Sequence, residues 1–232
     1  MVDKNIKIFP LGDNALTVSF GSEISPELNG FVIKLTQFFE QNQFPGLIET
    51  VPAYASLAIF YDVLIVRRNF AEFSTAYSAV KSLAENALQN LNEVIESKSR
   101  LVKIPVDFDK EFAPDLEFVA LKNNLTPKEV IEIFTAQIYR VYMLGFLPGF
   151  AYMGEVDERI AAPRKTSPRL QVPKGSVGIA GRQTGIYSLD SPGGWQIIGK
   201  TNVELFTPEA KTPTFLQAGD SVRFYKVTSK NF

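Results

Sequence analysis

Residues 172–187 read Val172-Pro173-Lys174-Gly175-Ser176-Val177-Gly178-Ile179-Ala180-Gly181-Arg182-Gln183-Thr184-Gly185-Ile186-Tyr187. A glycine interrupts the apolar and β-branched residues at every third or fourth position, which is typical of short strands joined by tight turns. The pattern extends to both sides, because residues 145–199 hold 10 of the 15 glycines and 5 of the 14 prolines, whereas residues 1–100 hold four of each. The stretch therefore predicts a β-barrel or a β-sandwich in the second half of the chain.

Short strands are expected across this whole second half, at residues 101–106, 139–144, 176–180, 195–198, 203–206 and 222–227. A short helix is also expected in this half. Thr126-Pro127-Lys128-Glu129 has the form of a capping box with proline at the first helical position, and it opens a helix that runs to Phe134.

The first half of the chain alternates strand and helix signals instead. Apolar runs at 6–9, 15–20, 48–51 and 57–61 predict four strands. Ser25 and Pro26 are typical first residues of a helix, and an apolar stripe at helical spacing follows to residue 39; a second stripe lies between 73 and 88. The order β-β-α-β-β-α predicts an α+β domain at 1–97, followed by a mainly β domain at 98–232.

Composition excludes several classes of function. The 232 residues include 24 Lys and Arg, 25 Asp and Glu, no His and no Cys, for a formal net charge of −1. Zinc fingers, disulfides and a Ser-His-Asp triad are ruled out, and no metal site is expected. The balanced charge does not favour nucleic acid as a partner. No apolar run is long enough for a membrane span and no secretory signal is visible, so we expect a cytoplasmic protein.

A basic stretch marks where binding chemistry is expected. Residues 159–189 contain no Asp or Glu but six positive side chains: Arg159, Arg164, Lys165, Arg169, Lys174 and Arg182. Because arginine forks match carboxylate and phosphate oxygens, the stretch is a candidate anion site. The alternative is a solvated surface whose charges pair with acids from elsewhere in the chain.

The glycines at 175, 178, 181 and 185 also have two interpretations. They could let backbone N–H groups approach a ligand, or they could be turn and bulge residues of a tight barrel, which we favour. Residues 194–201 fit the phosphate-loop pattern G-x-x-x-x-G-K-[ST]. However, turn formers precede the pattern and extended residues follow it, so a strand is predicted there instead.

Four single residues have both a structural and a functional interpretation. Asp107 and Asp109 share one face of an extended segment, and we interpret them as surface charges rather than as a pair of general bases. Trp195, the only tryptophan, is interpreted as a core anchor rather than a stacking platform. Tyr187 fits a buried hydrogen-bonding residue and a ligand contact equally well.

Several longer motifs are uncommon and follow one another in a fixed order. They read FPLGD at 9–13, VPAYASL at 51–57, GFLPGF at 145–150, PR at 163–164 and 168–169, VPKGSV at 172–177, QTGIY at 183–187, SPGGW at 191–195 and IG at 198–199. Together they closely resemble the allophanate hydrolase subunit 1 family over nearly the whole chain. That family includes the B subunit of bacterial 5-oxoprolinase and an inhibitor of a sporulation histidine kinase.

The resemblance implies an amino-terminal α+β domain and a carboxy-terminal cyclophilin-like β-barrel. It also implies the B subunit of an ATP-dependent 5-oxoprolinase, which opens 5-oxoproline to L-glutamate together with the A and C subunits. A histidine kinase inhibitor and a subunit of allophanate or urea metabolism are the alternatives. The active site is expected near the junction with the C subunit, so the chain alone is expected to be inactive, and its own contact with ATP stays open.

No catalytic residue is assigned on these grounds. The substrate carboxylate or a phosphorylated intermediate needs cationic and polar donors. The candidate residues for such binding are Arg164, Arg169, Lys174, Ser176, Arg182, Gln183, Thr184, Tyr187 and Trp195.

One position departs from the family that the motifs resemble. The family usually has a histidine just before the Thr-Ala-x-x-Tyr segment, which stands here at 135–139, and this chain has Phe134. If that histidine does acid–base work, the chain lacks it or has moved the role; otherwise the position is structural.

Overall fold

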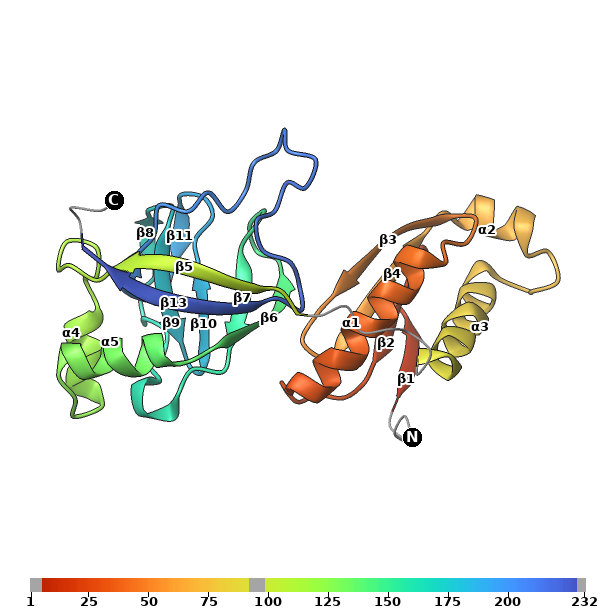
Figure 1. The fold of residues 1–232 in the computed structure, drawn as a ribbon. Helices are drawn as coiled ribbons and strands as arrows, with labels where there is room; N and C mark the ends of the chain where they lie inside the picture. Colours follow the sequence, from red (N-terminus) through yellow and green to blue (C-terminus); the bar gives the residue numbers. More distant parts are fainter. Residues whose placement is uncertain (1–5, 92–98, 229–232) are drawn as a thin grey trace. The chain divides into compact units, whose positions relative to one another are not determined.

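The computed structural model describes residues 6–91 and 99–228 (Figure 1). Its contacts divide the chain into two compact units, Met1–Lys98 and Ser99–Phe232. The predicted boundary between residues 97 and 98 falls in the segment 92–98, outside the described residues. No helix within the described ranges has the length and apolarity needed to cross a membrane.

The first unit is a four-stranded antiparallel sheet with helices packed against it (Figure 1). Its elements are β1 (Lys7–Pro10), β2 (Ala15–Ser19), α1 (Pro26–Gln41), β3 (Leu47–Pro52), β4 (Ser56–Tyr61), α2 (Val63–Asn69) and α3 (Ala76–Gln89), and the strand order is β1-β2-β4-β3. Alternate residues of the two central strands, such as Leu16 and Ile59, are fully buried with Val32 of α1 and Val80 of α3. The period-2 and helical patterns of the sequence thus meet in one core.

Helix starts in this unit follow the local sequence. The Ser25 hydroxyl accepts hydrogen bonds from the N–H groups of Glu27 and Leu28, at 3.2 and 3.4 Å, as its N-cap role predicts. The short α2 was not expected, because Leu64 and Ile65 are exposed and Val66 alone is buried, so the helix has no apolar stripe. Its start depends on the Asp62 carboxylate, which accepts from the Ile65 N–H.

The second unit contains a closed barrel of seven strands (Figure 1), which decides between the barrel and sandwich predictions. Around the barrel the strands are β10 (Gln183–Ile186), β7 (Ala151–Gly154), β6 (Tyr139–Leu144), β13 (Ser221–Val227), β5 (Leu101–Asp107), β12 (Gln196–Lys200) and β9 (Ser176–Ala180). The pair β5–β13 is parallel and the other pairs are antiparallel. Outside the barrel lie a two-stranded sheet and three short helical elements: β8 (Arg169–Val172), β11 (Ser191–Gly193), α4 (Leu116–Lys122), α5 (Pro127–Ala136) and η2 (Glu158–Ile160).

Three local predictions in this unit can be checked directly. The capping box is confirmed, because the Thr126 hydroxyl accepts from the Glu129 N–H and the Glu129 carboxylate accepts from the Thr126 N–H. The apparent phosphate loop is a strand, since its interior forms β12 and no helix follows it up to residue 228, where the described part of the chain ends. The strand predicted at 203–206 is wrong: the segment is a loop in which only Phe206 forms an isolated bridge, with Thr214.

The interpretation of Asp107 as a surface charge is wrong. The residue is fully buried, not a surface charge, because β12 and β13 flank the end of β5 on both sides, where Asp107 pairs with Lys200 and Val227. One carboxylate oxygen accepts from the Asp109 N–H at 2.8 Å.

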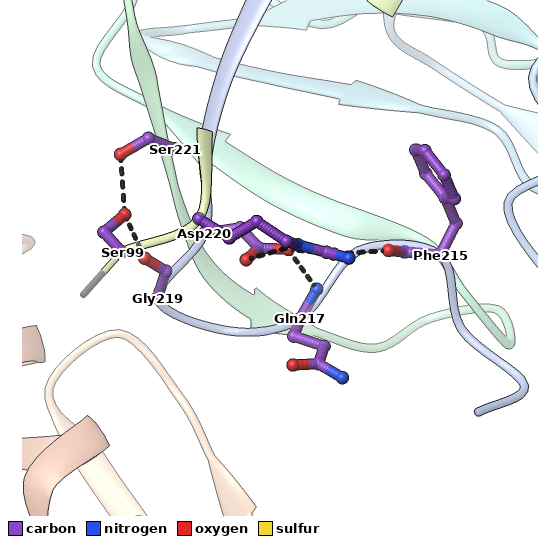
Figure 2. A network of polar contacts seen from close by, with 7 residues as sticks. Ser99, Phe215, Gln217, Gly219, Asp220 and Ser221 are labelled. Carbon is purple, nitrogen blue, oxygen red and sulfur yellow. Dashed lines mark hydrogen bonds and ion pairs between the residues drawn. The ribbon is translucent and has the colours of Figure 1, made fainter. Parts of the chain in front are cut away.

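A polar network ties the start of the second unit to the loop before β13 (Figure 2). The Arg100 guanidinium donates to both carboxylate oxygens of the buried Asp220, at 3.2 and 2.6 Å, and to the carbonyl of Phe215. The Ser99 hydroxyl donates to the Gly219 carbonyl at 2.9 Å. The network lies next to the start of the parallel pair, where Ser221 is opposite Leu101.

Candidate functional site

The second unit contains a cavity of about 280 Å³, which we call the aromatic cavity. Its wall is formed by residues that all lie between positions 146 and 195. The lining residues are Phe146, Phe150, Tyr152, Arg164, Lys165, Pro168, Tyr187, Pro192, Gly193, Gly194 and Trp195.

Phe150 is the centre around which the other rings are arranged. Its buried ring makes edge contacts with Phe146, Tyr152, Tyr187 and Trp195, at centroid distances of 5.6, 4.9, 5.4 and 5.5 Å. Edge-to-face contacts of this kind hold aromatic rings in defined orientations. The cavity therefore has a wall of aromatic rings held in defined orientations, with polar side-chain groups at its phenols, its cations and the Trp195 indole N–H.

The two phenols of the cavity are neutral donors at physiological pH. Burial raises the pKa of Tyr187, although a hydrogen bond with the Trp195 backbone and the nearby Arg164 oppose this shift. Burial likewise raises the pKa of Tyr152, again opposed by Arg164. None of the lining residues named above is acidic. This wall is thus suited to recognising a ligand and does not itself supply a general base.

Arg164 differs from the other cations of the basic stretch in its contacts. Its guanidinium lies 5.9 Å from the centre of the Trp195 ring, within the range of a cation–π contact. Within the described residues, it is the one positive side chain of 159–189 with no carboxylate partner. Its charge is therefore available to an anion that enters the cavity.

The other cations of the stretch are paired with acids from outside it. Arg159 holds Asp157 and lowers the pKa of that carboxyl to about 2. Lys174 pairs with Glu204. Arg182 pairs with two carboxylates, those of Glu155 and Glu158. These three cations therefore match the second interpretation of the basic stretch, a solvated surface whose charges pair with acids from elsewhere in the chain.

Arg169 and Lys165, both half-buried, pair with the buried carboxylate of Asp115. Arg169 Nη2 lies 2.7 Å from Asp115 Oδ1, and Lys165 Nζ lies 3.5 Å from the same oxygen. The other oxygen of this buried carboxylate accepts from the Ile197 N–H at 2.7 Å. Asp115 thereby joins residues 165–169, which border the cavity, to strand β12.

Asp115→Asn is expected to destabilise the second unit by about 2 kcal/mol, because it leaves the charge of Arg169 without its buried partner. Urea unfolding measures the change. Glu209→Gln, a neutralisation on an exposed loop, is the control and should change stability by less than about 0.5 kcal/mol. Equal losses in the two variants would contradict the role given to Asp115.

The remaining candidates from the sequence lie on barrel strands. The Thr184 hydroxyl is buried and donates to the Gly178 carbonyl at 2.9 Å. Ser176 on β9 is buried, and Gln183 on β10 is half-buried and pairs with Gly154 and Ala180. The aromatic cavity therefore brings together three of the nine candidates, Arg164, Tyr187 and Trp195.

Sequence reasoning missed most of the cavity wall. Phe146 and Phe150 stand in the motif at 145–150, but of the aromatic lining residues only Tyr187 and Trp195 were candidates for ligand contact. Asp115 was also missed; its position directly before the apolar run of α4 was a usable signal, because Asp is common at helix starts.

Residues 6–216 match the family model of the carboxyltransferase domain, subdomain C and D, and the chain belongs to this family. It is 48% identical over 227 residues to the B subunit of 5-oxoprolinase from Bacillus subtilis (strain 168), a match that covers 97% of this chain and 95% of that protein. The crystal structure of PH0987 from Pyrococcus horikoshii is 46% identical, with a TM-score of 0.56 over 97% of this chain and 99% of that one. TTHA0988 is 35% identical, with a TM-score of 0.78 over 93% of this chain, which spans 40% of that longer chain.

Proposed function

We propose that the chain is the B subunit of an ATP-dependent 5-oxoprolinase, which opens the ring of 5-oxoproline to give L-glutamate. The observation that carries the proposal is the 48% identity to the B subunit of a 5-oxoprolinase along nearly the full length of both chains. In the net reaction one water cleaves the ring amide, and ATP is hydrolysed to ADP and phosphate.

The aromatic cavity supports a binding role within such an enzyme. It offers a free guanidinium and two neutral phenols, and its wall has no carboxylate within the described residues. Acid–base groups and the ATP site are therefore assigned to the assembled complex, with the A and C subunits as partners, and this chain is expected to be inactive alone. Of the nine candidate residues, Arg164, Tyr187 and Trp195 are proposed as ligand contacts.

The domain description belongs to the same proposal. We propose a boundary near residue 97 and a cyclophilin-like identity for the barrel, with the C subunit next to it. A cyclophilin-like fold would not imply prolyl isomerase activity, because fold and chemistry separate readily.

The test is 5-oxoproline-dependent release of ADP by this chain mixed with its A and C subunits. Turnover is expected only when all three proteins are present. Turnover by this chain alone would contradict the assignment of the chemistry to the complex. No turnover from three folded and associated subunits would contradict the function itself, and would favour kinase inhibition or a urea-related substrate.

A further inference from the structure

The backbone at Phe146 is strained in a way that points to binding. Its φ is +68°, in the left-handed region that bulky side chains rarely adopt, and the Leu147 N–H donates to the Gly145 carbonyl at 2.9 Å. This i to i+2 hydrogen bond around a positive φ defines the rarer and more strained form of γ-turn. Strain of this kind persists only where surrounding structure enforces it, and it concentrates at functional sites.

The surrounding loop enforces the turn. The Gly145 N–H donates to the Phe150 carbonyl, and the Phe150 N–H donates to the Leu147 carbonyl, at 3.1 and 3.0 Å. Gly149 has a φ of +75°, and a Cβ there would lie 2.7 Å from the Leu205 carbonyl oxygen, so the turn packs closely against the loop that follows β12.

The strained turn holds an exposed aromatic ring at the cavity. Phe146 lines the cavity although 61% of its surface is accessible, and its ring stands edge-on to the buried Phe150. A large apolar side chain gains nothing from that exposure in the free protein. A ligand that covers the ring would bury it.

Charge and size narrow the class of ligand. Arg164 carries the unpaired charge, so the ligand has an anionic group, and the aromatic wall suits a flat, compact body. The volume of about 280 Å³ lies at the lower end of the range for small-molecule sites, which favours a ligand smaller than a nucleotide.

We infer that the aromatic cavity binds a small cyclic carboxylic acid, with the carboxylate on Arg164 and the ring covered by Phe146. The inference rests on the proposed function only in choosing 5-oxoproline, a five-membered lactam carboxylate, as the ligand to test. It assigns Phe146 as a ligand contact and Arg164 as the residue that selects for the carboxylate.

Trp195 makes a direct binding test possible, because it is the only tryptophan of the chain and it lines the cavity. Addition of 5-oxoproline to the full chain should change tryptophan fluorescence in a saturable way. Arg164→Gln should raise the dissociation constant about 10- to 100-fold, since a charge-assisted contact is lost. Arg223→Gln, on an exposed position of β13, is the matched control and should leave it unchanged.

Phe146→Gly separates binding from folding. Glycine accepts the positive φ without strain, so the variant should unfold at a higher urea concentration than the parent chain. Because the ring is lost, its dissociation constant should rise about tenfold. A variant with unchanged binding would overturn the role of Phe146.

Binding of substrate analogues and turnover of the three-subunit mixture test the inference further. Equal binding of 2-pyrrolidinone, which lacks the carboxylate, would remove Arg164 as its partner. A response to ATP and none to 5-oxoproline would make the cavity a nucleotide site. If the chain alone gives no fluorescence signal, the KM for 5-oxoproline is measured in the three-subunit mixture. A KM raised about tenfold in both Arg164→Gln and Phe146→Gly supports the site. An unchanged KM refutes it. Binding without any turnover would refute the proposed function and leave the cavity assignment standing.

Discussion

Gly175→Ala is expected to cost the second unit about 4 kcal/mol or more, which is enough to leave it largely unfolded. Gly175 has a φ of +83°, and a methyl group there would collide with the carbonyl oxygen of Thr201. The residue cannot move aside, because its N–H donates to the Tyr187 carbonyl at 2.7 Å and its carbonyl accepts from the Thr201 N–H at 2.9 Å. Urea unfolding followed by Trp195 fluorescence measures the loss within this unit.

Gly181→Ala is the matched control for this prediction. Gly181 also has a positive φ, +60°, but no atom lies within 4 Å of the position that its Cβ would take. The substitution should therefore cost only the left-handed strain, about 1–2 kcal/mol. If both variants lose the same amount, close packing is not the reason for glycine at 175.

This pair shows what the glycine pattern could and could not predict. The preference for turn and packing roles holds at Gly175, and at Gly185, where a Cβ would lie 2.9 Å from the Phe150 ring. The sequence predicted strands broken by glycine because that pattern is local. It could not rank the glycines, because the obstructing atoms come from residues brought close only by the closed barrel.

The prediction from the basic stretch, residues 159–189, was limited for the same reason. Six cations in a segment without an acid left two interpretations open, an anion site and a paired surface, and the partners of five of them lie outside the segment in sequence and beside it in space. Only the fold distinguishes Arg164 from Arg182. Of the aromatic wall, Tyr187 and Trp195 were among the candidates, but Phe146 and Phe150 were not, because they look like ordinary core residues until a turn places Phe146 at the surface.

Local signals, by contrast, predicted the strands of the first unit, the helices α1, α3 and α5 and five of the seven barrel strands, but they did not predict α2, α4, β7, β8, β10 or β11. Capping residues gave α1 and α5 their starts, and short apolar runs gave β2 and β4. The segment 203–206 has the alternation of a strand and was still mispredicted. Its backbone has no neighbouring strand to pair with along its length, because the barrel closes without it.

The sequence left open whether Phe134, which replaces a histidine common in the family, marks a loss of acid–base chemistry. The packing around its side chain favours a structural role. The side chain is fully buried, with its ring 4.9 Å from Phe224, 5.1 Å from Tyr139 and 6.3 Å from Phe108. It belongs to the barrel core and is not among the residues that line the aromatic cavity. We therefore interpret this position as structural in this chain.

Phe134→His is expected to destabilise the second unit by about 3 kcal/mol at neutral pH, because imidazole nitrogens would be buried among aromatic rings. It should not raise turnover of the three-subunit mixture. The loss should grow as the pH falls below about 6.5: burial lowers the pKa of the folded histidine, so the unfolded chain binds the proton more readily and is favoured in acid.

The control is Phe118→His, on α4, where 46% of the phenylalanine surface is exposed and a histidine stays hydrated. Its stability should change by less than about 0.5 kcal/mol and show little added pH dependence. Urea unfolding of both variants at several pH values makes the comparison. If Phe134→His is as stable as the parent and turns over faster, the histidine has a chemical role that this chain has lost. A pH-dependent loss of stability without faster turnover means that phenylalanine at 134 serves the packing of the barrel.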